Sequence, residues 1–197
     1  MNLFLNAVSN NWKLILFDIN KKIISEKDFQ ILWNESEKLI WIIDEFLDKN
    51  NMNYSDLENI VVVAGPWSFT WIRTIVLLVN TINFVIKKNI TSLNYFDLFE
   101  NFPVIKSSSK RDSFFKKDKN SEIEVIKNDD ILEYLKQNNI KKLYWENKAL
   151  TQSLLWGREV AAIKIFEKID YCDIINKIEF KQEKIIKPIY IKKPSIS

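Results

Sequence analysis

Histidine is absent from the 197 residues of this chain, and glycine and cysteine are rare. Without histidine, the chain cannot build a Ser-His-Asp triad, a histidine general base or a histidine-ligated zinc site. The single cysteine, Cys172, excludes an intramolecular disulfide and fits a reducing compartment. Glycine occurs only at Gly65 and Gly157, although an average usage of roughly 7% would supply about 14. Several classes of hydrolase and zinc enzyme are therefore excluded at the outset.

A strong net charge and a long apolar run are also missing. Lys and Arg number 29 and Asp and Glu 26, which is too even to indicate nucleic acid or membrane as an obligatory partner. The longest uncharged stretches, 59–72 and 74–86, fall short of the ~20 apolar residues of a spanning helix. Residues 1–11 lack the basic segment and apolar core of a secretory signal. We therefore expect a cytoplasmic protein with no membrane partner.

Hydrophobic residues make up 47% of the chain, enough for a packed core, and their spacing predicts strands followed by helices. In the first half, strands are expected over 13–17, 23–31 and 60–64, the last being a continuous apolar run typical of a buried parallel strand. Asn34 can cap a helix over about 35–49. A second helix over about 72–88 has almost no polar face, and a short helical piece over 92–100 follows.

The second half is more polar and repeats the pattern of the first on a smaller scale, which favours an α/β fold of two unequal parts. We place the boundary at Pro103, giving a subdomain of residues 1–102 and a smaller one of residues 103–197. The pattern predicts a hairpin over 106–120, strands over 122–126 and 140–144, helices over 129–137 and 151–168, and an extended segment over 187–192.

The most informative stretch runs from Ser55 to Arg73. It resembles the signature of the TsaB (YeaZ) family, Gly-Pro-Gly-Ser-Phe-Thr-Gly-Leu-Arg after a strand introduced by Ser-Asp-Leu. Two motif glycines fall on Trp67 and Trp71. The resemblance is strong over 35–100 and weak over 103–187, and Pro-Ile-Tyr-Ile at 188–191 looks like the family's C-terminal Pro-Val-Tyr-Leu. Six residues match the motif in place: Gly65, Pro66, Ser68, Phe69, Thr70 and Arg73.

The resemblance implies an actin-like ATPase (ASKHA, ribonuclease H-like) fold of two subdomains, the second one shortened. Members of the family are non-catalytic dimerisation subunits of the bacterial machinery that makes threonylcarbamoyladenosine in tRNA. Implied partners are a TsaD-type catalytic paralogue, a TsaE-type ATPase and, when the chain is alone, a second copy. The catalytic paralogue carries a histidine-bound metal, so this histidine-free chain is not that subunit. The resemblance implies no intrinsic cofactor or metal, and ATP only at an interface with partners.

The family binds its catalytic paralogue through two helices, which correspond to the two apolar helices expected here. An apolar surface of that extent on a small protein is normally covered by a partner, although an ordinary core between helix and sheet is the alternative. Introducing a charged residue at Ile75 or Leu78 is expected to abolish the complex and leave the monomer folded. The interface candidates are Leu39, Ile42, Ile43, Phe46, Ile75, Leu78, Val79 and Ile82.

Other positions have both a functional and a structural interpretation. The loop Gly65–Thr70 can cradle a phosphate or carboxylate, or be a plain strand-to-helix corner. Arg73 can hold an anion, a partner or a structural salt bridge. Asn6 stands where the family usually has Asp, and an amide lacks the charge that magnesium requires, which argues against autonomous ATP hydrolysis. The basic segment of the predicted hairpin either makes an indirect or weak contact with tRNA or is merely a solvated hairpin. It contains Lys106, Lys110, Arg111, Lys116, Lys117 and Lys119, with Phe114 and Phe115 beside them.

The tryptophans raise a separate question, because the shortage of glycine and the excess of tryptophan occur together. One hypothesis is that UGA encodes glycine in the source and was translated here as tryptophan, in which case the motif would be complete. A tight loop before a helix favours glycine for its positive φ and close backbone approach. The alternative is that the tryptophans are genuine in a diverged member. The positions are Trp12, Trp33, Trp41, Trp67, Trp71, Trp145 and Trp156.

Three functions follow. The first is a non-catalytic scaffold subunit that binds the TsaD-type paralogue. The second is an independent nucleotide-dependent or peptidase-like enzyme, against which the missing histidine and Asn6 both count. The third is a diverged homodimer with no role in tRNA modification.

Overall fold

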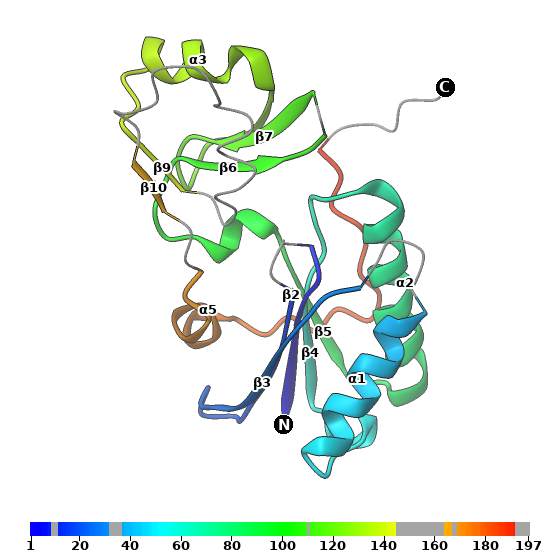
Figure 1. Ribbon diagram of the computed structural model, residues 1–197. Coiled ribbons are helices and arrows are strands. Elements are labelled where there is room, and N and C mark those ends of the chain that lie inside the picture. Colours follow the sequence, from blue (N-terminus) through cyan, green and yellow to red (C-terminus); the bar gives the residue numbers. More distant parts are fainter. Residues whose placement is uncertain (9–11, 32–36, 110, 145–163, 167–168, 192–197) are drawn as a thin grey trace. The chain divides into compact units, whose positions relative to one another are not determined.

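The computed structural model describes residues 1–8, 12–31, 37–109, 111–144, 164–166 and 169–191. The chain divides into two compact units (Figure 1). Unit 1 comprises Met1–Tyr95 and Tyr171–Tyr190, and unit 2 comprises Phe96–Asp170 and Ile191–Ser197. The predicted boundary at Pro103 lies close to the first crossing between units, and the return of Tyr171–Tyr190 to unit 1 was not part of that prediction.

Unit 1 is built on a five-stranded sheet in the order β3-β2-β1-β4-β5. Its strands are β1 (Asn2–Asn6), β2 (Trp12–Phe17), β3 (Ile23–Phe29), β4 (Asn59–Val63) and β5 (Asn89–Leu93). The first three strands form an antiparallel meander, and β4 and β5 add parallel to β1 on its other side. Every residue of β1 and β4 is buried, so the predicted buried parallel strand is confirmed.

Helices cover both faces of this sheet. Helix α1 (Lys38–Lys49) and helix α2 (Phe69–Ile86) lie on one side, and the short helix α5 (Tyr171–Lys177) lies on the other (Figure 1). Helix α1 buries one stripe at the i, i+4, i+7, i+8 spacing that turns apolar residues toward a core. The stripe consists of Leu39, Ile43, Phe46 and Leu47.

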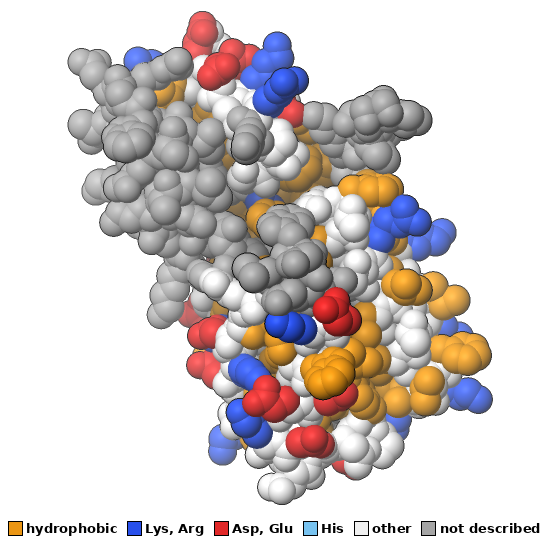
Figure 2. Space-filling view, turned by 45° about the vertical axis from the view of Figure 1, so that its right-hand side comes forward, with side chains coloured by type: hydrophobic (Ala, Val, Ile, Leu, Met, Phe, Trp, Pro, Cys, Tyr) orange, Lys and Arg blue, Asp and Glu red, His pale blue; other side chains and the backbone are white. Residues whose placement is uncertain are grey.

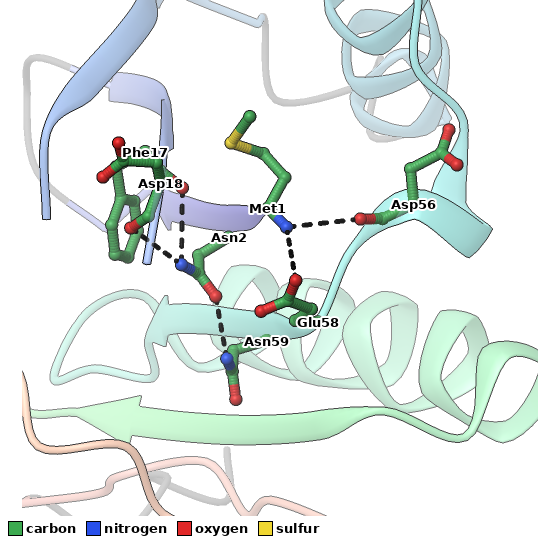
Figure 3. A network of polar contacts seen from close by, with 7 residues as sticks. All are labelled: Met1, Asn2, Phe17, Asp18, Asp56, Glu58 and Asn59. Carbon is green, nitrogen blue, oxygen red and sulfur yellow. Dashed lines mark hydrogen bonds and ion pairs between the residues drawn. The ribbon is translucent and has the colours of Figure 1, made fainter. Parts of the chain in front are cut away.

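A buried amide network ties the three central strands together at the amino end of β1 (Figure 3). Asn2 donates from Nδ2 to the carbonyl oxygens of Phe17 (3.3 Å) and Asp18 (3.1 Å). Its Oδ1 accepts a hydrogen bond of 2.7 Å from Asn59 Nδ2. Both asparagines are buried, and these bonds supply the partners that buried amides require.

Unit 2 is a second five-stranded sheet, in the order β10-β9-β6-β7-β8, with one described helix on it. The elements are β6 (Val104–Ser107), β7 (Asp112–Lys116), β8 (Ile123–Lys127), α3 (Ile131–Gln137), β9 (Lys142–Tyr144) and β10 (Lys164–Phe166). Single 3-10 turns in the chain are Tyr54–Asp56, Tyr95–Leu98 and Asn128–Asp130. The core of unit 2 consists of Ile105, Phe115, Ile126, Ile131, Leu135 and Leu143.

The mixed α/β class and most elements expected from the sequence are confirmed, including the hairpin of β6 and β7. Helix α1 begins at Lys38 rather than near residue 35, and Asn34 lies outside the described residues. Helix α2 begins earlier than expected, at Phe69. Strand β5 was missed because the helical pattern runs to its edge. The helix ends where Lys87 adopts a left-handed backbone with φ 52°, and the chain turns directly into β5.

The expectation for the last third was partly wrong. A helix was predicted over 151–168, but residues 164–166 form β10, paired parallel to β9. Residues 164–166 form a strand because the edge of β9 offers them backbone hydrogen-bond partners, which no local sequence pattern reveals. Residues 151–163 lie outside the described part of the chain. Helix α5 was not predicted.

Helix α2 is long and apolar enough, by length and composition, to cross a membrane; it is the one such helix among the described residues. A core helix of a water-soluble protein passes the same test, so this is weak evidence for a membrane segment. In the structure, α2 packs its buried stripe onto the sheet of unit 1.

Candidate functional site

The motif loop begins at a corner that only glycine fits. Gly65 has φ +127°, and a Cβ built there would lie 2.6 Å from the carbonyl oxygen of Ile189. That close approach exists because Ile189 N donates to Ala64 O at 2.9 Å, while Tyr95 N donates to Gly65 O at 2.7 Å. The first motif residue is therefore locked against the C-terminal segment, and the two stretches that resemble the family meet in space.

Trp71 fills the space between this corner and the end of β1. Its side chain is 3% exposed, and its Nε1 donates to Ala7 O at 2.6 Å. The indole stacks on Trp12 with ring centroids 4.8 Å apart, and Trp12 in turn meets the edge of Phe29 at 5.5 Å. On the β1 side, the corner is thus closed by aromatic packing.

The backbone dihedral angles at the described tryptophans do not require glycine. None of Trp12, Trp41, Trp67 and Trp71 has a positive φ. The expected left-handed backbone at positions 67 and 71 is therefore not present, because Gly65 makes the reversal and Trp71 already belongs to the first turn of α2. The remaining three tryptophans, Trp33, Trp145 and Trp156, lie outside the described residues.

Asn6 serves as a structural link at the end of β1. It is fully buried; its Nδ2 donates to the Tyr171 hydroxyl at 2.9 Å and its Oδ1 accepts from Val8 N at 3.2 Å. Tyr171 also meets the Phe4 ring edge-on at 5.7 Å, which anchors α5 to the sheet. Among the described residues, no three His, Cys, Asp or Glu side chains are grouped so that they could hold a metal ion.

Lys13 places a positive charge beside this link. Its Nζ lies 5.3 Å from the centre of the Tyr171 ring, 3.2 Å from Glu26 and 3.1 Å from Asp28. Burial alone would lower the pKa of Lys13, but hydrogen bonds and charge from Asp28 and Glu26 outweigh it and raise that pKa. The ammonium group therefore stays charged beside the end of β1.

Most of the predicted interface residues face inward. Ile42 and Leu78 are half-buried. Replacing the buried Ile75 with an acidic residue would place a carboxylate in the core. A folded monomer is therefore not expected for that variant, which corrects the earlier prediction. The buried members are Leu39, Ile43, Phe46, Ile75, Val79 and Ile82.

A different apolar set covers the solvent side of the two helices, where hydrophobic side chains gather in Figure 2. We call it the outer helix surface. The sequence could not single it out, because α2 is apolar on all sides and its periodicity does not separate inner from outer positions. Its members, with their exposed fractions, are Ile40 (36%), Trp41 (73%), Leu77 (68%), Phe84 (83%) and Val85 (74%).

The basic hairpin of unit 2 is less accessible than its sequence suggests. Lys106 is 1% exposed, and Phe114 and Phe115 are buried, so these three cannot contact tRNA directly in this structure. The hairpin packs them because both strands lie inside the sheet. Lys110 lies outside the described residues, Lys116 is half-buried, and Arg111, Lys117 and Lys119 are exposed.

Comparison with solved structures supports the fold. No protein-family model matches the chain, and a search of curated proteins finds no match. A crystal structure described as an uncharacterized protein with similarity to peptidase YEAZ from Pseudomonas aeruginosa aligns with a TM-score of 0.69 at 10% identity, covering 97% of this chain and 99% of that one. YeaZ from Pseudomonas aeruginosa aligns with a TM-score of 0.50 at 14% identity, covering 64% and 63%. The chain therefore has the fold of the YeaZ (TsaB) structures.

Proposed function

We propose that this chain is a TsaB-type, non-catalytic scaffold subunit that binds a TsaD-type catalytic paralogue in tRNA threonylcarbamoylation. In this proposal both units are subdomains of an actin-like fold. The likeness to YeaZ structures and the repeated mixed sheet support that assignment.

The outer helix surface is the observation that carries the proposal. Four large apolar side chains on two helices of one layer are each more than two-thirds exposed, and large apolar patches on soluble proteins usually mark interaction sites. The TsaB resemblance assigns partner binding to these helices. Trp41 is the aromatic anchor of the kind that dominates binding energy at interfaces.

Two further features favour a scaffold over an independent enzyme. The chain contains no histidine, and Asn6 is engaged by Tyr171 and Val8 where a family member with Asp would carry a charge. ATP hydrolysis or peptide cleavage by the purified chain alone would contradict this part of the proposal.

Binding to the TsaD-type subunit of the same genome tests the proposal. We expect the double variant Leu77→Asp/Phe84→Asp to remain folded, because both side chains are exposed, and to lose at least about 100-fold in affinity by titration calorimetry. The matched control is Ile19→Asp, which adds a carboxylate at an exposed apolar side chain (65%) outside the helices. Failure of the unmodified chain to bind, or unchanged binding by the double variant, would refute the proposal.

A further inference from the structure

A preformed groove runs along α2, beside the C-terminal segment of unit 1. Its volume is about 450 Å³. We call it the α2–tail groove. It shares only Leu77 with the outer helix surface. Its lining residues are Phe69, Thr70, Arg73, Thr74, Val76, Leu77, Asn80, Ile186 and Pro188.

Paired hydrogen bonds fix the far wall of the groove. The side chain of Asn80 donates to Ile186 O and accepts from Ile186 N, both at 3.0 Å. One helical turn further on, Asn83 Nδ2 donates to Lys184 O at 3.1 Å. These bonds replace the strand partners that the extended segment would otherwise lack, so the groove keeps its shape without a ligand.

One charge stands in this apolar setting. Arg73 is the only charged residue in the lining and the only one in α2, and it forms no ion pair with another described residue. Its guanidinium lies 5.2 Å from the Phe69 ring, which itself stacks on Tyr190 at 5.0 Å. The contact with the ring holds the guanidinium beside Phe69, and because Arg73 is exposed its N–H groups can reach a bidentate partner.

We propose that the α2–tail groove receives a helix of the partner subunit that carries a carboxylate, which pairs with Arg73 while a neighbouring apolar side chain packs between Leu77 and Pro188. This inference rests on the proposed function. The occupant follows from charge complementarity, since the groove offers a single exposed cation and no carboxylate of its own. The outer helix surface then supplies most of the affinity, and Arg73 fixes the register of the partner helix.

Charge variants at position 73 test the groove apart from the surface. We expect Arg73→Glu to lower affinity for the TsaD-type subunit at least about tenfold, and Arg73→Lys to lower it less, because lysine keeps the charge and loses the bidentate geometry. The effect of Arg73→Glu should shrink at high ionic strength. The matched control is Ile19→Glu, which adds the same charge at an exposed position outside both the groove and the two helices and should bind nearly as the unmodified chain does.

A charge swap identifies the occupant. Single Asp→Arg and Glu→Arg changes in the partner's contacting helix should include one that restores binding to Arg73→Glu and weakens binding to the unmodified chain. If Arg73→Glu binds as Ile19→Glu does while Phe84→Asp/Val85→Asp, which leaves the groove lining unchanged, abolishes binding, the groove inference fails and the proposed function stands. If Arg73→Glu changes only self-association in sedimentation, the occupant is a second copy and the inference is overturned. No binding by the unmodified chain would remove both.

Discussion

The two units share one topology and differ in what they build on it. In each, three antiparallel strands are followed by two strands parallel to the first, so that β3-β2-β1-β4-β5 corresponds to β8-β7-β6-β9-β10. The helix that follows the meander is α1 with 12 residues in unit 1 and α3 with seven in unit 2. The two units thus share their strand order, although the helices that connect the strands differ in length.

The candidate sites found here belong to the connections of unit 1. The glycine corner, the outer helix surface and the α2–tail groove all lie on or beside α1 and α2. Function on a shared architecture depends on such local additions rather than on the architecture itself. The difference between the units can therefore be tested by substituting the residues of one such feature of unit 1 at a time.

The largest effect is expected at the aromatic packing of unit 1. Trp71→Gly removes the stack on Trp12 and the hydrogen bond to Ala7 O, leaving a cavity, and should lower the free energy of unfolding by about 3–5 kcal/mol. Because these contacts lie inside unit 1, hydrogen exchange should quicken in β1 and β4 more than in β6 and β7. Urea unfolding and exchange by mass spectrometry measure both.

Trp41→Gly is the matched control, since that side chain is exposed and its loss costs only helix propensity, about 0.5–1 kcal/mol. Equal destabilisation by both variants would contradict the packing role of Trp71. Peptide masses of the native protein then decide between the two hypotheses for positions 67 and 71. Glycine masses would mean that the corner is open in the cell, and tryptophan masses that it is closed as described.

The sequence predicted the fold better than the surface. The continuous apolar run before Gly65 predicted β4, and the motif predicted the strand-to-helix corner, because both depend on local pattern. The approach of Ile189 to Gly65 depends on a partner far away in the chain, and no periodicity reveals it. The link of Asn6 to Tyr171 was hidden for the same reason.

The interface residues show where pattern reasoning ends. A helix that is apolar on every side does not show which of its positions face the sheet, and Leu78 rather than Leu77 was predicted at the interface. The structure half-buries Leu78 and exposes Leu77. On α1 the pattern identified the apolar positions correctly. The exposed Trp41 was considered only for whether its codon encodes glycine, and not as part of an interface.

A smaller effect is expected at the ends of two helices, one in each unit. Both α2 and α3 are followed by a left-handed residue, Lys87 with φ 52° and Asn139 with φ 53°. Asparagine tolerates this conformation better than lysine does, and glycine tolerates it best. Lys87→Gly should therefore stabilise the chain by roughly 0.5–1 kcal/mol and Asn139→Gly by less. Thermal unfolding of the two variants checks the order, and a larger gain at Asn139 would reverse the argument.

The smallest effect is expected where each helix is tied to the edge strand of its meander. In unit 1, Glu45 of α1 pairs with Lys27 of β3 at 2.7 Å. In unit 2, Tyr134 of α3 donates to Glu124 of β8 at 3.4 Å. The hydrogen bonds and charges of Lys27 and Lys49 lower the pKa of Glu45 to about 2. Burial, together with the charge and hydrogen bond of Glu124, raises the pKa of Tyr134.

The Glu45–Lys27 ion pair and the Tyr134–Glu124 hydrogen bond should therefore weaken at opposite ends of the pH scale. Since the folded-state pKa of Glu45 lies below its unfolded value of 4.5, its contribution is present above pH 4.5 and is lost as the pH falls toward 2. The contribution of Tyr134 is present below its unfolded pKa of 10.0 and is lost as the pH rises through the higher folded value. In urea unfolding, Glu45→Gln should flatten the acid limb of the stability profile, and Tyr134→Phe the alkaline limb. Both effects should be small and should shrink with salt, because Glu45 is exposed and Tyr134 only half-buried. An acid limb unchanged by Glu45→Gln would mean that α1 is held to the sheet by its buried stripe alone, as its packing of Leu39, Ile43 and Phe46 already allows.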